Sequence, residues 1–217
     1  MTHHSEPTWV VVVPVKRAEI AKSRLTGVSA QQRAELARAF PADCAESALA
    51  APYVHGVVVV TDDDIARRQF EALGADVIAD TPDAGLNPAL QHAGAYARRQ
   101  YADCPVAALS GDLPALRPLE LATALLAATD HPRAFLADHS GDGTTLLTAL
   151  PDIDLDPHFG RGSCARHLDS GAVELDPHGL TSLRRDVDTR ADLRDALEIG
   201  VGRHTREVLE RLPLRVD

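Results

Sequence analysis

The sequence predicts a single α/β domain with a mostly parallel central sheet and helices on both faces, a three-layer α/β/α sandwich. Three observations lead to this prediction: short β-branched runs alternate with alanine-rich segments, the runs are apolar almost throughout, and no repeat or linker interrupts the alternation. The 217 residues, 45% of them hydrophobic, suit one such domain. We therefore expect a short tail at residues 1–8 and one domain at residues 9–217.

Five apolar runs are expected to form the strands. They are Trp9–Val15, His55–Asp62, Ala75–Asp80, Pro105–Asp112 and Pro132–Asp138. Near-continuous apolar character is typical of parallel strands that helices cover on both faces. Because ligands of such sheets bind beyond the carboxyl ends of the strands, we expect functional side chains directly after these runs.

Four segments between the strands have helical character, at residues 29–40, 64–74, 87–100 and 119–129. The first begins with Ser29 and Gln32 at capping-box spacing. Pro41 is expected to kink or break this helix. From about Asp138 onward the chain is richer in Gly, Asp and Pro, which favours a substrate loop region folded over the strand ends.

Composition argues against several functions. A formal net charge of −10 disfavours a nucleic-acid groove. The apolar run at residues 9–15 is too short to cross a membrane, and the polar N-terminus does not resemble a signal peptide. We therefore expect a cytoplasmic protein that binds neither nucleic acid nor membrane. Cys44, Cys104 and Cys164 are expected to be free, buried thiols.

Common motifs of nucleotide-binding proteins and hydrolases are missing. The sequence contains no G-x-x-x-x-G-K-[ST], no G-x-G-x-x-G after the first strand and no G-x-S-x-G. The ten histidines show no spacing typical of metal ligands, and we interpret most of them as surface residues.

Both lysines of the chain, Lys16 and Lys22, lie just after the first predicted strand, while the other twenty basic residues are arginines. Lys and Arg are interchangeable on a surface but not in a site, and a compact ammonium suits a phosphate. With Ser23 and Arg24, the two lysines indicate a phosphate-binding loop. A solvated loop of ordinary charges is the alternative.

Three aspartates are candidate metal ligands. Asp112 ends the fourth predicted strand, where turn chemistry is the alternative explanation. If residues 183–188 are extended, Asp186 and Asp188 point to the same face, and a cation would relieve their repulsion. Alternatively, Asp188 or Thr189 caps the following helix and Asp186 is solvated.

Two later segments combine hydroxyls with glycines. "DGTTLL" contains Thr144 and Thr145, and "FGRGSCARH" contains Gly160, Gly162 and Ser163. Ser163 is a candidate N-cap of a short helix. A glycine-rich turn at a helix start is also typical of anion sites.

Seven segments, in order, resemble the 2-phospho-L-lactate and phosphoenolpyruvate guanylyltransferase family of coenzyme F420 biosynthesis. They are "VPVKRAEIAKSRL", "VVVVTDD", "GLNPAL", "SGDLPAL", "GDGTTLL", "FGRGSCARH" and "DVDTRADL", and the resemblance extends from Trp9 to about Gly200. It implies a single-domain GT-A-like nucleotidyltransferase, related in fold to molybdenum-cofactor guanylyltransferases. It also implies transfer of GMP from GTP to a phospho-acid, with release of pyrophosphate.

The resemblance implies roles for individual residues as well. Asp112, Asp186 and Asp188 would bind Mg²⁺ or Mn²⁺. Thr145, Gly160 and Ser163 would bind the phospho-acid. Lys16, Lys22 and Arg24 would handle phosphate as catalytic residues, and Asp62 and Asn87 would bind the nucleotide. Because the phosphate of the acceptor is already ionised, the transfer needs no general base.

We expect phosphoenolpyruvate as the acceptor, giving enolpyruvoyl-2-diphospho-5'-guanosine, because the "GTT…FGRGS" part looks closer to that branch. The alternative acceptor is 2-phospho-L-lactate, giving lactyl-2-diphospho-5'-guanosine. More remote alternatives are a nucleotidyltransferase of the molybdenum-cofactor or sugar-phosphate type and a non-catalytic nucleotide-binding domain. We also expect a homodimer and passage of the product to the downstream F420 biosynthesis transferase.

Overall fold

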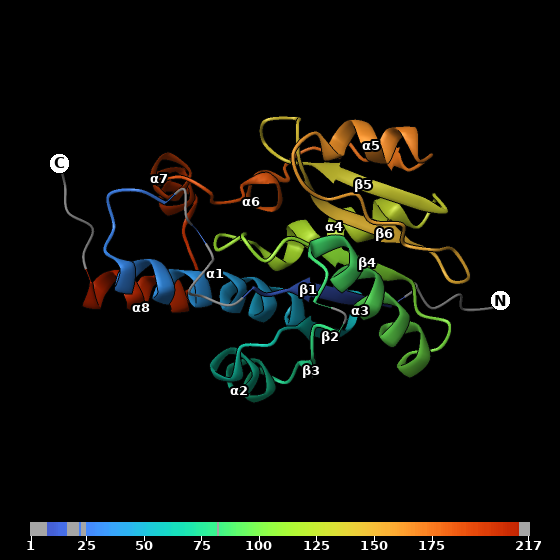
Figure 1. The fold of residues 1–217 in the computed structure, drawn as a ribbon. Coiled ribbons are helices and arrows are strands. Elements are labelled where there is room, and N and C mark those ends of the chain that lie inside the picture. The colour runs from blue at the N-terminus through green and yellow to red at the C-terminus, as the bar shows by residue number, and fades with distance from the viewer. Residues whose placement is uncertain (1–7, 17–21, 23–24, 82, 213–217) are drawn as a thin grey trace.

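The computed structural model describes residues 8–16, 22, 25–81 and 83–212, and these residues form one seven-stranded sheet with helices around it (Figure 1). The strand order is β3-β2-β1-β4-β6-β5-β7. The strands are β1 (Trp9–Pro14), β2 (Val54–Val60), β3 (Asp76–Ile78), β4 (Val106–Leu109), β5 (Arg133–Ala137), β6 (Thr144–Ala149) and β7 (Val173–Glu174). All strand pairs are parallel except those of β6, which runs antiparallel to β4 and β5. The predicted mostly parallel sheet is confirmed, and β6 and β7 add to the five expected strands.

Helices cover both faces of the sheet, as predicted. They are α1 (Ala30–Leu49), α2 (Asp64–Leu73), α3 (Leu86–Gln100), α4 (Pro118–Ala128), α5 (Ser163–Asp169), α6 (Thr181–Arg184), α7 (Arg190–Ile199) and α8 (Arg203–Arg211). Side chains of α1, α2 and α4 pack on one face against alternate residues of β1, such as Val11 and Val13. Side chains of α3 and α5 pack on the other face, with Val10 and Val12. Buried alternation on both sides of β1 explains its uninterrupted apolar run.

The long helix α1 extends beyond the sheet, and α7 and α8 cover its N-terminal half (Figure 1). Leu36 and Phe40 of α1 pack there against Val187, Leu193 and residues of α8. The N-terminus of α1 has the predicted capping box of Ser29 and Gln32. This packing brings the segment before α7 back to the strand ends.

The predicted break at Pro41 is wrong, because α1 runs through this residue to Leu49. Proline removes one backbone donor, which weakens a helix locally. On either side of it, however, Phe40 and Ala42 are fully buried in two different core clusters. Tertiary packing therefore outweighs the local cost.

Several smaller expectations can also be compared with the structure. The three cysteines are free, but only Cys44 is buried, while Cys104 and Cys164 are partly exposed. No helix among the described residues is both long and apolar enough to span a bilayer. Of the predicted tail, only Thr8 lies within the described residues.

Candidate active site

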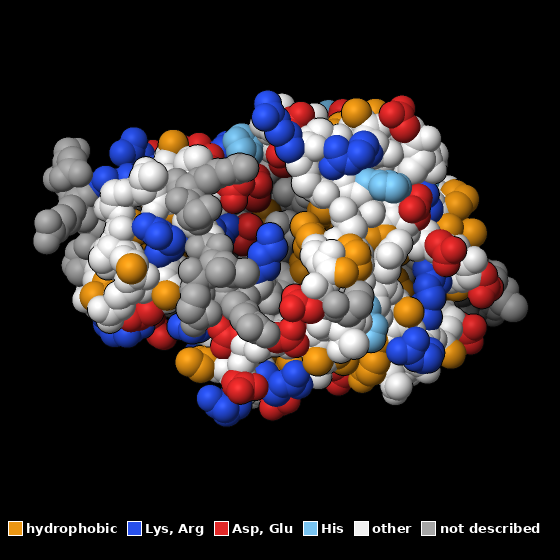
Figure 2. Space-filling model, in the orientation of Figure 1, with side chains coloured by type: hydrophobic (Ala, Val, Ile, Leu, Met, Phe, Trp, Pro, Cys, Tyr) orange, Lys and Arg blue, Asp and Glu red, His pale blue; other side chains and the backbone are white. Residues whose placement is uncertain are grey.

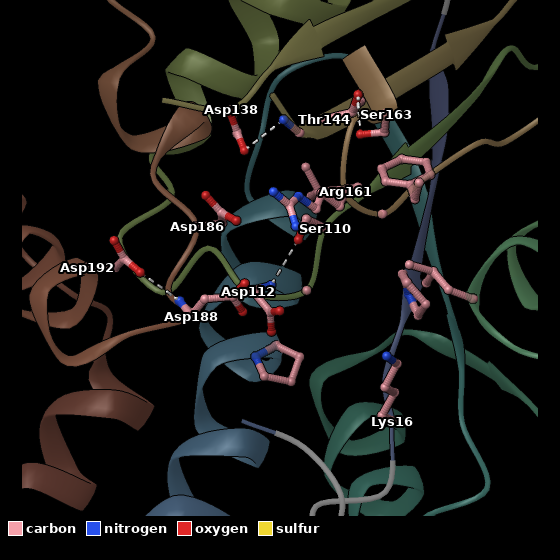
Figure 3. A pocket seen from close by; sticks show the side chains of 18 of the residues that line it. Lys16, Ser110, Asp112, Asp138, Thr144, Arg161, Ser163, Asp186, Asp188 and Asp192 are labelled. Carbon is pink, nitrogen blue, oxygen red and sulfur yellow. Dashed lines mark hydrogen bonds between the residues drawn. The ribbon is translucent and has the colours of Figure 1, made fainter. Parts of the chain in front are cut away.

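A pocket of about 770 Å³ lies beyond the carboxyl ends of β1, β4 and β5, where the sequence predicts the ligand site. Lys16 follows β1, residues 110–112 follow β4, and residues 138–143 follow β5. Acidic side chains gather near the centre of the face that Figure 2 shows. The pocket is lined by two separate groups of polar side chains, one of carboxylates and one of hydroxyls (Figure 3).

One side, the acidic wall, consists of Asp112, Asp186 and Asp188, all three predicted from the sequence. A backbone hydrogen bond joins their two loops, because the Val187 N–H donates to the Asp112 carbonyl at 2.9 Å. The condition that residues 183–188 are extended is not met throughout, since α6 continues to Arg184. The register of Val187 against Asp112, rather than a strand, brings the carboxylates to one side.

The residue that caps α7 is Thr189, one of the two candidates considered. Its hydroxyl accepts from the Asp192 N–H, and the Asp192 carboxylate accepts from the Thr189 and Asp188 N–H groups. Burial tends to raise the pKa of Asp192, but these hydrogen bonds outweigh it and the pKa is lowered. The cap therefore holds the backbone of Asp188 and leaves its side chain at the pocket.

Asp186 is the most perturbed carboxyl of the acidic wall, with its pKa raised to about 6. Burial is the largest cause, and the charges of Asp138 and Asp188 add to it. The His139 ring opposes them, with Nδ1 at 3.4 Å from a carboxylate oxygen of Asp186. Positive charge beside Asp186 is therefore favoured.

Lys22 lies against the acidic wall, and its side chain is only 4% exposed. Its Nζ is 2.6 Å from Asp112 Oδ1 and 3.7 Å from Asp188 Oδ1, and it donates to the Val187 carbonyl at 2.7 Å. Lys16 is exposed and lines the pocket on another side (Figure 3). Arg24, the third predicted phosphate-handling residue, lies outside the described residues.

The acidic wall suits a hard divalent cation. Asp112, Asp186 and Asp188 offer carboxylate oxygens, the preferred ligands of Mg²⁺ and Mn²⁺. The raised pKa of Asp186 and the ammonium of Lys22 both indicate that positive charge is favoured there. The chemistry of this donor set suits the predicted metal, but among the described residues these three carboxylates are not close enough together to ligate one ion jointly, and the metal itself remains a prediction.

A second part of the lining, the hydroxyl wall, consists of Thr144, Gly160 and Ser163. Figure 3 shows Thr144 and Ser163 close together and away from Asp112 and Asp188. Ser163 is not the N-cap of α5, since Gly162 takes that position and Ser163 is the first helical residue. Its hydroxyl lies 3.1 Å from Thr144 Oγ1. Gly160 has φ of 116°, a left-handed conformation that favours glycine.

Thr145, the predicted acceptor contact, is not among the described lining residues, whereas its neighbour Thr144 is. The pairing of β5 with β6 shifts register here, so that Leu136 pairs with Leu146 but Ala137 pairs with Thr144. This bulge inserts Thr145 as an extra residue and changes which threonine faces the pocket. The hydroxyl of Thr145 is buried without a hydrogen-bond partner among the described residues.

In the described part of the chain, neither of the two predicted nucleotide contacts lines the pocket. Asp62 accepts from the Asp80 N–H at 3.0 Å and so ties the ends of β2 and β3 together. Asn87 exchanges two hydrogen bonds with the backbone of Phe159, which does line the pocket. Their roles toward a nucleotide remain predictions.

Sequence reasoning missed Asp138, although it ends a predicted strand run, as Asp112 does. Its carboxylate accepts from the N–H groups of Ser140 and Gly143 and from the Ser140 hydroxyl. Asp138 therefore shapes the loop between β5 and β6 and contributes charge beside Asp186. The position after the strand was the signal that could have identified it.

Solved structures of several proteins share this fold. Rv0371c of Mycobacterium tuberculosis aligns with a TM-score of 0.58 at 21% identity, over 89% of this chain and 99% of that one. A second structure of Rv0371c, a complex with manganese, has a TM-score of 0.57 at 20% identity and the same coverage. CMP:2-keto-3-deoxy-manno-octonic acid synthetase, solved with CTP, aligns at 0.57 and 18% identity, over 88% and 98% of the two chains. The fold is therefore the GT-A-like fold that the resemblance implies.

Sequence comparison identifies the family. Residues 9–217 match the profile of the family described as "Guanylyl transferase CofC like". The phosphoenolpyruvate guanylyltransferase of Streptomyces coelicolor is 54% identical over 94% of this chain and 97% of its own. The protein of the same name from Thermomonospora curvata is 48% identical over 98% and 93%. The chain belongs to the CofC guanylyl transferase family, and the predicted membership is confirmed.

Proposed function

We propose that this protein transfers GMP from GTP to phosphoenolpyruvate, giving enolpyruvoyl-2-diphospho-5'-guanosine and pyrophosphate in coenzyme F420 biosynthesis. Relatives that carry the name of this activity are 44–54% identical to the chain. The single observation that carries the proposal is a pocket with carboxylates on one side and hydroxyl and glycine residues on the other. This division suits a reaction between two anionic phosphates.

Charge neutralisation is the chief requirement, because the acceptor phosphate attacks another phosphate. Asp112, Asp186 and Asp188 would hold a divalent cation, which would supply positive charge between the reacting phosphates. Lys16, exposed at the pocket, is placed to bind phosphate oxygens of GTP. Lys22 pairs with Asp112 and Asp188 and, by donating to the Val187 carbonyl, would hold the spacing of these two carboxylates.

The hydroxyl wall would orient the acceptor. Thr144 and Ser163 offer hydroxyl groups, and Gly160 lets an anion approach the backbone without a side chain in the way. An ionised phosphate needs no base, so orientation and charge are what these residues must provide. Binding the acceptor opposite the acidic wall would align its phosphate with the α-phosphorus of GTP.

Mass spectrometry of the reaction products tests the proposal. The purified protein would be incubated with GTP and Mg²⁺, and either phosphoenolpyruvate or 2-phospho-L-lactate. We expect pyrophosphate and the enolpyruvoyl product with the first acceptor, at a higher kcat/KM than with the second. Preference for 2-phospho-L-lactate would reassign the acceptor. Absence of product with both, while the protein still binds GTP, would contradict the proposed activity.

Three further expectations accompany this function: action in the cytoplasm, a homodimer, and release of the product to a downstream transferase. Light scattering at working concentrations tests the dimer. A coupled assay with the downstream transferase tests whether the product is accepted.

A further inference from the structure

His167 of α5 is fully buried directly behind the hydroxyl wall, although the sequence pattern favours a surface position. Three rings enclose it, with centroid distances of 5.6 Å to Phe135, 5.4 Å to Phe159 and 5.8 Å to His158. Its Nδ1 is 2.9 Å from Thr144 Oγ1, and Thr144 lines the pocket. A polar ring is thus fixed between the core and the acceptor side of the site.

The neighbours of His167 determine its tautomer. The backbone N–H of His158 donates to Nε2 at 3.0 Å, and a backbone amide can only donate. Nε2 must therefore be unprotonated, so the neutral ring carries its hydrogen on Nδ1 and donates to Thr144 Oγ1. Burial lowers the pKa of His167 to about 4, which keeps the ring neutral near pH 7.

The tautomer of His167 determines how many hydroxyl hydrogens of Thr144 and Ser163 remain available to donate to a ligand. Thr144 and Ser163 together have two hydroxyl hydrogens, and their mutual contact at 3.1 Å uses one. Because His167 donates to Thr144 and accepts nothing from it, the second hydrogen stays available at the pocket. In the other tautomer Thr144 would donate to Nδ1, Ser163 would donate to Thr144, and no hydroxyl hydrogen would remain.

We propose that His167 is a positioning residue that commits the Thr144–Ser163 hydroxyl pair to donate a hydrogen bond to an anionic oxygen of the acceptor. The chain of donors runs from the His158 backbone through the ring to Thr144 and ends at the pocket. Such a pair favours an ionised oxygen over a group that must itself donate. The inference rests on the proposed function, since it takes the phospho-acid to lie on this side.

Two substitutions at His167 test the roles of its Nδ1 and Nε2 separately. In His167→Asn the side-chain amide nitrogen occupies the place of Nδ1 and still donates to Thr144. In His167→Gln the amide lies where Nε2 was, so it accepts from His158 but leaves no donor at Thr144. Each variant is designed to keep one of the two hydrogen bonds of the ring. His178→Gln, at an exposed position outside the pocket, is the control.

Steady-state kinetics with each substrate varied in turn, together with thermal unfolding, tests the positioning role. We expect His167→Gln to raise the KM for phosphoenolpyruvate about ten-fold or more, because without the donor behind it the Thr144 hydroxyl is no longer held with its hydrogen toward the pocket. His167→Asn should stay within about three-fold of wild type, and neither variant should change the KM for GTP. Equal effects of Asn and Gln, or a wild-type KM in the Gln variant, would overturn the inference.

A readout independent of turnover distinguishes this inference from the proposed function. The ¹⁵N shifts of the His167 ring should show a protonated Nδ1 and an unprotonated Nε2, and the opposite tautomer would overturn the inference. If wild-type protein fails to use phosphoenolpyruvate, the proposed function fails alone. Calorimetric titration with inorganic phosphate would then still decide the matter, with Asn expected to bind as wild type does and Gln more weakly.

Discussion

The acidic wall and the hydroxyl wall of the pocket differ in exposure and in charge. On the acidic wall the side chains of Asp112 and Asp188 are 42% and 48% exposed, and loops alone carry them. On the hydroxyl wall Ser163 is fully buried and Thr144 nearly so, and β6, α5 and His167 hold them in place. One wall is open and charged, while the other is closed and neutral.

This difference follows from what each wall must bind. Carboxylates that bind a cation reversibly must stay accessible to water, because burying a carboxylate without a partner of opposite charge is costly. Hydroxyls that orient a ligand can be buried if every hydrogen bond behind them is satisfied. We therefore expect substitutions on the acidic wall to affect turnover, and substitutions on the hydroxyl wall to affect acceptor binding.

The largest effect is expected for Asp112→Asn or Asp188→Asn. Each removes one negative charge from the proposed cation site, so kcat should fall on the order of 10²- to 10³-fold in Mg²⁺. Chelation by EDTA should abolish the activity of the wild type, and added Mg²⁺ or Mn²⁺ should restore it. Asp169→Asn, exposed and outside the pocket, is the control. Full activity in chelator would refute the metal assignment.

Lowering the pH should change the free energy of unfolding in opposite directions through His167, behind the hydroxyl wall, and Asp186, on the acidic wall. The pKa of His167 is lowered to about 4 by burial and by His158, Arg133 and Arg166, against the opposing charge of Asp156. A base with a depressed pKa stabilises the fold above its unfolded pKa of 6.5, and this contribution, at most about 3 kcal/mol, is lost as pH falls toward 4. The raised pKa of Asp186 acts oppositely, since the folded state takes up its proton first.

Denaturant unfolding of metal-free protein between pH 7 and pH 4 measures both contributions. The free energy of unfolding of the wild type, relative to His167→Asn, should decrease as the pH falls through this range. Relative to Asp186→Asn, it should increase between about pH 6 and pH 4. Parallel pH curves for wild type and His167→Asn would show that His167 does not titrate as its burial requires.

The sequence predicted what depends on local pattern. The apolar runs identified five strands because all of them except the partly buried edge strand β3 have core residues on both faces, and Asp112 followed from its place at a strand end. Contacts between distant segments could not be predicted in this way. Lys22 and Val187 are 165 positions apart, and only the packing of α7 and α8 on α1 brings them together.

On the acceptor side of the pocket, two features could not be predicted from sequence patterns. Thr144 and Thr145 are adjacent, and only the bulge between β5 and β6 determines which of them faces the pocket. A bulge changes the alternation of side chains without leaving a clear signature in a strand of this composition. The burial of His167 was likewise hidden, because α5 has only seven residues and too few turns for a helical period.

Valine substitutions at these two threonines test the bulge directly. Thr144→Val removes a hydroxyl that lines the pocket, so the KM for phosphoenolpyruvate should rise roughly ten- to a hundred-fold. Thr145→Val removes a hydroxyl without a described partner, so we expect almost no change in either KM. The reverse pattern would mean that Thr145 is the acceptor contact, as the family resemblance implies.

The smallest effect is expected at the cap that supports the acidic wall. Thr189→Ala removes the N-cap of α7 and should lower the free energy of unfolding by about 1 kcal/mol, whereas Thr189→Ser should keep it. Thr123→Ala serves as the control, because that exposed hydroxyl donates only to the Leu119 carbonyl within α4. Since Asp192 still accepts from the Asp188 N–H, kcat should fall far less than in Asp188→Asn. Any loss of activity should appear in kcat at saturating phosphoenolpyruvate, because the cap supports only the acidic wall. A rise in the KM for phosphoenolpyruvate instead would mean that the two walls move together, and the division of labour between them would have to be abandoned.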